Sequence, residues 1–200
     1  MDYVSRAPRA PEGEFDLRGL WPTPGPIELD VGFGRGASLF HRAEAAPAAR
    51  LLGIEIKAKW ATKVAERAQR LGLDEIQIFC GDAREILTRA GPVACVERVF
   101  VHFPDPWWKK RHLKRRVVGD AFLDAVSRLL VDDGELFIQT DVPDRAEIYR
   151  DSLVVHRDFA LAGDDGWLER NPYAAASNRE ERAARDGLPV RRLLARRRVR

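Results

Sequence analysis

The chain has 200 residues, of which 45% are hydrophobic and 32% are charged, and it carries a formal net charge of +3. These values indicate one globular domain with a sizeable core and exclude a mainly disordered chain. A net charge this small also excludes binding to a polyanion through overall charge alone, so any such binding depends on where the cations cluster.

Nothing in the sequence indicates export or a membrane. It has no apolar run typical of a signal peptide, and no apolar stretch approaches the length of a membrane-spanning helix. Cys80 and Cys95 lie in or beside apolar stretches and are predicted to be buried free thiols. The four histidines lack metal-ligand spacing, so no metal site is predicted. We therefore expect a cytoplasmic protein without a metal.

Strands and helices alternate along most of the chain. Residues 1–26 contain five prolines and predict an arm with little regular structure, either disordered or in contact with a substrate. After this arm, the apolar patterns predict strands at 27–31, 51–56, 75–80, 96–101 and 135–140, and helices at 37–46, 58–71, 83–89 and 122–130. Such alternation with short loops predicts a single α/β domain over 27–200, with a doubly wound and mostly parallel sheet.

A glycine-rich loop follows the first predicted strand. Its glycines, Gly32, Gly34 and Gly36, stand where a ligand must approach the backbone closely, although a structural turn alone also explains them. The spacing differs from the usual dinucleotide-binding pattern, and the loop lacks the Lys-Ser/Thr pair of a triphosphate site. The loop therefore favours another kind of nucleoside ligand.

Three acids stand at the ends of three successive predicted strands. Asp30 precedes the glycine loop, and Glu55 follows the loop by about twenty residues, where a carboxylate can bind ribose hydroxyls. Asp82, before Ala83, suits an adenine amino group, but it could equally cap the helix that it opens. Carboxylates repel a triphosphate and favour a cationic ligand, and S-adenosylmethionine, a sulfonium that carries a nucleoside and an amino acid, fits this description.

The most specific stretch is 99–116. An apolar strand ends at Pro104 and Pro106, because proline cannot continue a ladder, and Asp105 lies between these two prolines. Two tryptophans come next, and then a run of cations without an acid: Lys109, Lys110, Arg111, Lys114, Arg115 and Arg116. A carboxylate at the edge of an α/β sheet, joined to a basic and aromatic run, indicates an enzyme that acts on a nucleic acid.

These residues resemble the tRNA (guanine-N7-)-methyltransferases of the bacterial single-subunit type. The similarity extends over residues 27–180 and is most specific in Phe103-Pro104-Asp105-Pro106-Trp107 and the basic run after it. The resemblance implies a Rossmann-like class I methyltransferase fold of about seven strands, with an antiparallel C-terminal strand. It further implies methyl transfer from S-adenosylmethionine to N7 of a guanine in the variable loop of tRNA, by a monomer or homodimer without an obligatory protein partner.

The resemblance also assigns residues by position. It implies that the cofactor contacts Asp30, Gly32, Gly34, Gly36, Glu55, Asp82, Ala83 and Asp105, with Asp105 also catalytic. It implies that the substrate contacts Lys109, Arg111, His112, Lys114, Arg115, Arg116, Asp141, Ser177 and Glu180. One departure concerns the family's Thr-x-Phe-Glu signature, which stands here as Ser177-Asn178-Arg179-Glu180, so that Arg179 replaces the aromatic residue.

Alternatives remain for several features. The chain could be an RNA-binding protein of methyltransferase fold that modifies another base or has no activity; the cofactor acids argue against the inactive form. A nicotinamide-dependent oxidoreductase is disfavoured by the glycine spacing and the basic run. At least one of Trp107 and Trp108 is expected to be structural. The C-terminal arginines could form a second RNA patch, or one face of a final antiparallel strand pairing near 156–161.

Asp105 provides the first prediction. Guanine N7 carries a lone pair at neutral pH, so no general base is needed, and the protein must supply alignment and a setting for positive charge. We expect Asp105→Asn to bind tRNA with near-normal affinity and to lose methyl transfer, because the size of the side chain is kept and its charge is lost. Measured tRNA affinity and methylation rate decide this; weak tRNA binding with turnover intact would contradict it.

Overall fold

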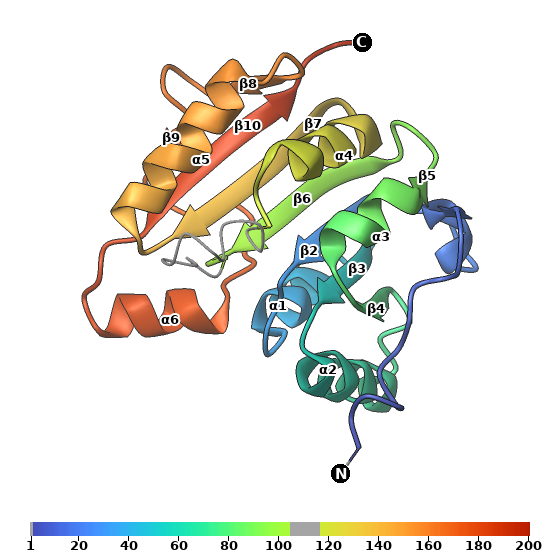
Figure 1. Cartoon of the computed structure of the whole chain (residues 1–200). Helices are drawn as coiled ribbons and strands as arrows, with labels where there is room; N and C mark the ends of the chain where they lie inside the picture. Colours follow the sequence, from blue (N-terminus) through green and yellow to red (C-terminus); the bar gives the residue numbers. More distant parts are fainter. Residues whose placement is uncertain (1, 105–116) are drawn as a thin grey trace.

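The structure is a computed structural model that describes residues 2–104 and 117–200 (Figure 1). Several predicted site residues lie outside these described residues: Asp105, Lys109, Arg111, His112, Lys114, Arg115 and Arg116. The two tryptophans at 107 and 108 lie outside them as well.

An eight-stranded mixed sheet forms the centre of the described structure, with the order β4-β3-β2-β6-β7-β10-β8 and β9 paired to β10. The parallel strands are β2 (Ile27–Val31), β3 (Arg50–Glu55), β4 (Ile76–Cys80), β6 (Val96–His102) and β7 (Leu130–Thr140). The antiparallel part consists of β10 (Arg191–Arg197), β8 (Phe159–Leu161) and β9 (Trp167–Leu168). The predicted doubly wound, mostly parallel sheet with an antiparallel C-terminal strand is confirmed, with one strand more than the seven expected.

Helices cover both faces of this sheet (Figure 1). On one face α3 (Ala83–Arg89), α4 (Asp120–Leu129) and α5 (Pro143–Val155) pack over alternate strand residues such as Val99 and Val101. On the other face α1 (Ala37–Ala45) and α2 (Ala58–Leu71) pack against β3 and β4, and α6 (Asn178–Arg185) lies near the ends of the strands. Within the described residues, no helix has both the length and the apolar character needed to cross a membrane.

The predicted elements are found, with one strand longer than expected. β7 begins at Leu130 and not at residue 135, since Val96 pairs with Leu130 and Arg98 already pairs with Glu135. This register shift sets residues 131–134 of β7 opposite the single residue Glu97 of β6, which is a bulge-like irregularity. Asp133 in this segment adopts a φ of 62°.

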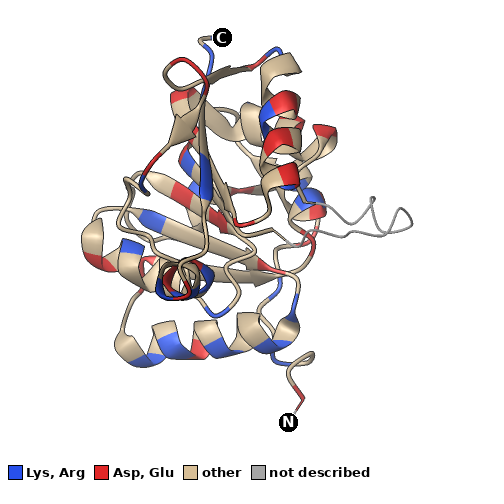
Figure 2. Cartoon of the chain, turned by 90° about the vertical axis from the view of Figure 1, so that its left-hand side faces the viewer, with Lys and Arg blue, Asp and Glu red and all other residues tan. Residues whose placement is uncertain are grey.

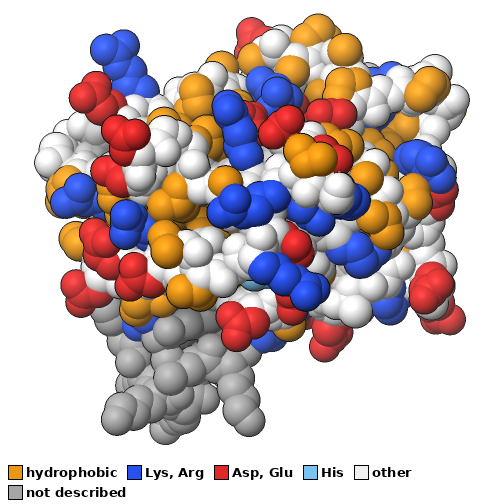
Figure 3. All heavy atoms as spheres, turned by 90° about the horizontal axis from the view of Figure 1, so that it is seen from above, with side chains coloured by type: hydrophobic (Ala, Val, Ile, Leu, Met, Phe, Trp, Pro, Cys, Tyr) orange, Lys and Arg blue, Asp and Glu red, His pale blue; other side chains and the backbone are white. Residues whose placement is uncertain are grey.

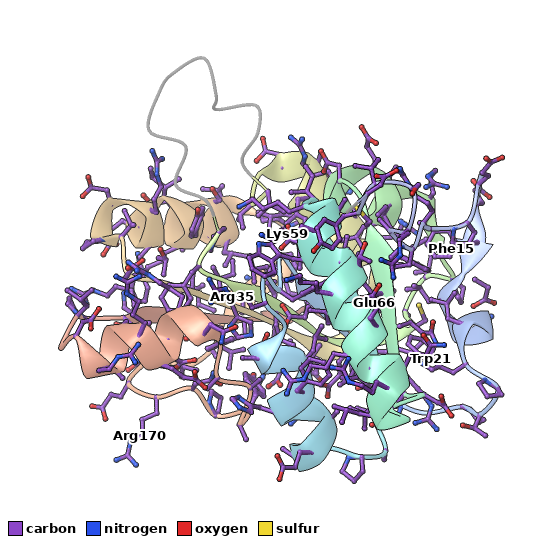
Figure 4. The ribbon with its side chains drawn as sticks, turned by 90° about the horizontal axis from the view of Figure 1, so that it is seen from below. Phe15, Trp21, Arg35, Lys59, Glu66 and Arg170 are labelled. Atoms are coloured by element: carbon purple, nitrogen blue, oxygen red, sulfur yellow. The ribbon has the colours of Figure 1, made fainter. Side chains whose placement is uncertain are left out.

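The segment before β2 packs on the domain. It contains β1 (Phe15–Asp16), which pairs in parallel with β5 (Ala90–Gly91), and the short 3₁₀ helix η1 (Leu17–Leu20). Leu17 and Trp21 are buried in the core, and the Trp21 indole donates a hydrogen bond to the Glu75 carbonyl at 2.9 Å. Figure 4 shows Phe15 and Trp21 on this segment, at the side of the molecule away from Arg170.

The two cysteines are both free, but they differ in burial. Cys80 is buried as expected, whereas Cys95 is only partly buried because it precedes the first residue of β6. Burial raises the pKa of the Cys95 thiol to about 11, so this thiol is protonated at neutral pH.

A buried carboxylate joins three elements at the centre of the sheet. Glu28 on β2 is 1% exposed, and its carboxylate accepts hydrogen bonds from Arg42 of α1 at 2.6 and 2.7 Å and from Arg98 of β6 at 2.8 Å. Removing one partner of a buried ion pair leaves the other charge without compensation, which costs much more than the pair contributes when intact.

We therefore expect Glu28→Ala to lower the free energy of unfolding by about 3–5 kcal/mol, because two arginines lose a shared partner. Urea denaturation measures this. The matched control is Glu44→Ala, at an exposed position of α1, which should change stability by less than about 0.5 kcal/mol. Equal effects of the two substitutions would show that the Glu28 cluster contributes nothing specific.

Candidate active site

A cleft of about 1480 Å³ lies at the carboxyl ends of the parallel strands. The order of the strands reverses between β2 and β6, and residues on both sides of this point line the cleft. In open α/β sheets, ligands bind at such a point. The turn after β2, the ends of β3 and β4, and α6 all contribute to its walls.

The glycine loop requires glycine for conformational reasons. Gly32, Gly34 and Gly36 have φ values of 78°, 58° and 82°, in the left-handed region that other residues rarely adopt. A Cβ atom at Gly36 would also lie 2.8 Å from Val64 of α2. The loop can therefore present its backbone to the cleft while α1 and α2 pack closely behind it.

Glu55 lies between this loop and α2. Its carboxylate accepts a hydrogen bond from the Gly34 amide at 2.9 Å and another from the Lys57 amide at 2.8 Å. The residue is 5% exposed and lines the cleft. These two bonds fix the position of the carboxylate, and its remaining lone pairs are available to a ligand.

Asp30 lies behind the loop, and it is not among the residues that line the cleft. It is 3% exposed and accepts a hydrogen bond from the Ser38 hydroxyl, while its Oδ1 has no partner in the described part of the chain. Burial, and to a lesser degree the charge of Glu55, raise the pKa of Asp30 to about 7. In this position Asp30 supports the loop and α1 from below.

Asp82 both caps a helix and lines the cleft. It caps α3 by accepting a hydrogen bond from the Arg84 amide at 2.9 Å, and together with Ala83 it lines the cleft. Hydrogen bonds from the Arg84 side chain and amide lower the pKa of Asp82, so the carboxylate stays charged. A helix cap and a cleft-facing acid are therefore compatible at this position.

The wall across the cleft is formed by the end of β7 and by α6. Asp141, which follows β7, forms an ion pair with Arg179 of α6, and both line the cleft. Ser177 lines it too, and its hydroxyl caps α6 by accepting from the Glu180 amide at 3.2 Å. The arginine that departs from the family signature thus pairs with an acid expected to contact the substrate.

Glu180 faces the sheet, and it is not among the residues that line the cleft. Its carboxylate accepts hydrogen bonds from Gln139 at 2.8 Å, Asn171 at 3.1 Å and Arg192 at 3.0 Å. Burial acts to raise the pKa of Glu180, but these donors outweigh it and lower the pKa. Glu180 therefore holds α6 against the ends of the strands.

The same network fixes a buried histidine that the sequence did not single out. The Gln139 amide nitrogen, which donates to Glu180, also lies 2.7 Å from Nδ1 of His102. Nδ1 must then be the acceptor, so the ring proton is on Nε2. Burial lowers the pKa of His102 to about 4, which keeps the ring neutral, and the residue lines the cleft beside Phe103 and Pro104.

Sequence reasoning also missed several basic and aromatic residues of the cleft. These are Arg35, Lys57, Trp60, Arg84, Arg182 and Arg185. Two signals were available: Arg35 lies between the last two glycines of the loop, and Ser177 with Glu180 forms the S-x-x-E pattern that starts a helix. Asp30, Glu55, Asp82 and Asp141, by contrast, come together at one end of the sheet, as parallel strands require.

Comparison with known proteins gives the family. Residues 24–193 match the family model described as "Putative methyltransferase". The tRNA (guanine-N(7)-)-methyltransferase of Rhodospirillum rubrum is 36% identical over 193 residues, which cover 94% of this chain and 75% of that protein. The enzyme of the same name from Microcystis aeruginosa is 35% identical, over 86% of this chain and 82% of that protein. The chain belongs to the tRNA (guanine-N7-)-methyltransferase family.

Solved structures with low sequence identity support the fold of this family member. The 16S rRNA methyltransferase KamB superposes with a TM-score of 0.63 at 18% identity, over 91% of each chain. TrmN from Thermus thermophilus gives a TM-score of 0.60 at 22% identity, over 87% of this chain and 44% of that one. At these identities the similarity shows the Rossmann-like methyltransferase fold alone.

The raised pKa of Asp30 predicts a pH-dependent stability. Between pH 3.8 and about 7 the folded protein holds a proton on Asp30 that the unfolded chain has lost, so rising pH removes stability. Asn does not titrate, so the stability of Asp30→Asn relative to wild type should increase by about 1.4 kcal/mol per pH unit in this range and level off above it.

Chemical denaturation of both proteins at several pH values measures this difference. His102, whose pKa is lowered, contributes a slope of the opposite sign between pH 4 and 6.5. That contribution is common to both proteins and cancels in the difference. A difference that does not change with pH would show that Asp30 is ionised throughout.

Proposed function

We propose that this protein transfers the methyl group of S-adenosylmethionine to N7 of a guanine in the variable loop of tRNA. The activity would belong to one domain over residues 27–200, in a cytoplasmic monomer or homodimer without an obligatory protein partner. The observation that carries the proposal is the composition of the cleft. The glycine-loop side presents glycines and the carboxylates of Glu55 and Asp82, which suit a cationic nucleoside, beside cations such as Arg35. On the other side α6 contributes Arg179, Arg182 and Arg185, which suit a polyanion.

The cofactor wall fits S-adenosylmethionine in size and charge. The cleft exceeds the roughly 300–1,000 Å³ of a typical small-molecule pocket, so it has room for the cofactor and a base. Gly32 and Gly34 allow close approach of a ligand to the backbone, and Glu55, which the Gly34 amide holds in the cleft, would accept hydrogen bonds from ribose hydroxyls. Asp82 would hold the adenine side. When bound, the cofactor supplies an electrophilic methyl group on a sulfonium.

The substrate wall would orient the guanine. N7 already has a lone pair, so the residues need only align it and stabilise the positive charge that develops on the purine. Asp105, which directly follows the cleft-lining Pro104 in the chain, is our candidate for this electrostatic role. Asp141 could accept hydrogen bonds from the guanine edge, with Arg179 holding its carboxylate in place. The run from Lys109 to Arg116 would contact phosphates.

Transfer of labelled methyl groups from S-adenosylmethionine to unmodified tRNA, followed by nucleoside analysis, tests the proposal. We expect 7-methylguanosine as the labelled product. The matched control is the same tRNA with 7-deazaguanosine at the target position, because carbon replaces the nucleophilic nitrogen there and no label should enter.

Two results would contradict the proposed reaction. Label in a nucleoside other than 7-methylguanosine would show that the protein modifies another RNA base, and Arg179 would then be the first residue to examine. Cofactor binding without transfer to any tRNA would show an RNA-binding protein that keeps the methyltransferase fold.

A further inference from the structure

The solvent-facing side of α2 carries a row of cations. Lys59, Lys63, Arg67 and Arg70 are all exposed, and their spacing of four, four and three residues places them on one face of the helix. The opposite face, with Ala61, Val64 and Ala68, is buried against the sheet. The row is roughly 17 Å long at a rise of 1.5 Å per residue. Figure 2 shows this helix along the bottom of the molecule, and in Figure 4, seen from below, it faces the viewer.

Aromatic rings hold most of these cations. The Lys59 ammonium lies 5.3 Å from the centroid of the Trp60 ring, the Lys63 ammonium lies 6.0 Å from Tyr3, and the Arg67 guanidinium lies 3.9 Å from Phe40. Arg35 of the glycine loop lies 5.1 Å from the same Trp60 ring. A ring attracts and orders a cation without cancelling its charge. These side chains are therefore partly immobilised and still fully positive.

The one acid on this face is already paired within the described structure. Glu66 of α2 forms an ion pair with Arg6 of the N-terminal segment. Among the described residues, no carboxylate lies within ion-pair distance of Arg35, Lys59, Lys63 or Arg67. The charge of this face is therefore not neutralised by the residues around it.

The C-terminal arginines differ in this respect. Arg192 pairs with Glu180, Arg196 with Glu135 and Arg200 with Asp132, at 3.0, 3.2 and 2.6 Å. They belong to or follow β10, so the antiparallel strand is the alternative that the structure supports for them. Figure 3, which views the molecule from the side opposite to α2, shows acids and bases interspersed. Such a surface carries little net field.

The basic face of α2 is continuous with the cleft. Arg35, Lys57 and Trp60 line the cleft, and Lys59 follows at the exposed start of the helix. In Figure 4 Arg35 and Lys59 lie close together, where the glycine loop meets the N-terminal end of α2. A polyanion that enters the cleft could therefore continue along the helix.

We propose that the face formed by Arg35, Lys59, Lys63, Arg67 and Arg70 is a second RNA-contact surface, which binds tRNA phosphates beside the cofactor cleft. This inference rests on the proposed function for the nature of the polyanion. RNA fits better than an acidic protein because the surface is continuous with the cleft that receives the target base. Because rings already order the cations, little side-chain entropy is lost when phosphates bind.

The test compares two double variants that remove the same charge. Lys59→Ala with Lys63→Ala changes the α2 face. Arg157→Ala with Arg196→Ala changes exposed cations on and beside β8 and β10, toward the edge of the sheet opposite to β4 and α2. For each protein we would measure tRNA affinity across a salt series by fluorescence anisotropy, and the affinity for S-adenosylhomocysteine as a check on folding.

Loss of two phosphate contacts should reduce the slope of log affinity against log salt by about 1.4–1.8 in the α2 variant. The control variant should keep the wild-type slope, and both should bind S-adenosylhomocysteine normally. A wild-type slope in the α2 variant would overturn the inference and leave an acidic protein as the partner for this face. Formation of 7-methylguanosine by the wild-type protein is measured in a separate assay. That assay tests the proposed function, whereas the salt series tests whether the α2 face contacts RNA.

Discussion

The cleft depends on the junction between β2 and β6, and the ion pairs of Glu28 hold this junction together. β2 and β6 are neighbours in the sheet, but the chain leaves them in opposite directions: from β2 toward β3 and β4, and from β6 toward β7. This reversal opens a cleft at their carboxyl ends. Glu28 binds β6 through Arg98 and α1 through Arg42, one turn of helix beyond the loop-supporting Ser38. A buried carboxylate at the base of the junction thus holds the sheet and the glycine-loop helix in one arrangement.

The charged side chains on the two sides of the cleft are held in place by different partners. On the cofactor side the Glu55 carboxylate is held by the backbone amides of Gly34 and Lys57. On the far side Arg179 is held by Asp141, and α6 is anchored from beneath by the contacts of Glu180. A sulfonium cofactor needs a negative group nearby and a phosphate backbone needs positive ones, and the cleft offers both, with Glu55 on one side and the arginines of α6 on the other.

The sequence predicted the parallel part of the sheet well because alternating apolar runs and helices are local signals. It also placed Asp30, Glu55 and Asp82 at the ends of three successive strands, and parallel strands end at one edge; of these, Glu55 and Asp82 line the cleft and Asp30 lies behind the loop. It did not predict α6, although Ser177 and Glu180 carry a helix-start pattern, because the two residues were interpreted only as substrate contacts. The burial of Glu180 depends on Gln139 and Arg192, which lie on two other strands, and single-sequence reasoning has no access to such long-range pairing.

The same limitation explains why the number of cations in a segment does not predict whether that segment binds RNA. The last ten residues and α2 both contain several arginines or lysines, and the sequence drew attention to the first group because its charges are consecutive. In the structure Arg192, Arg196 and Arg200 each face a carboxylate, whereas Lys59, Lys63 and Arg67 face rings. An arginine beside a carboxylate adds less net positive field to the surface than a cation whose charge is not compensated. The partner of a cation, more than the number of cations, decides which surface can attract RNA.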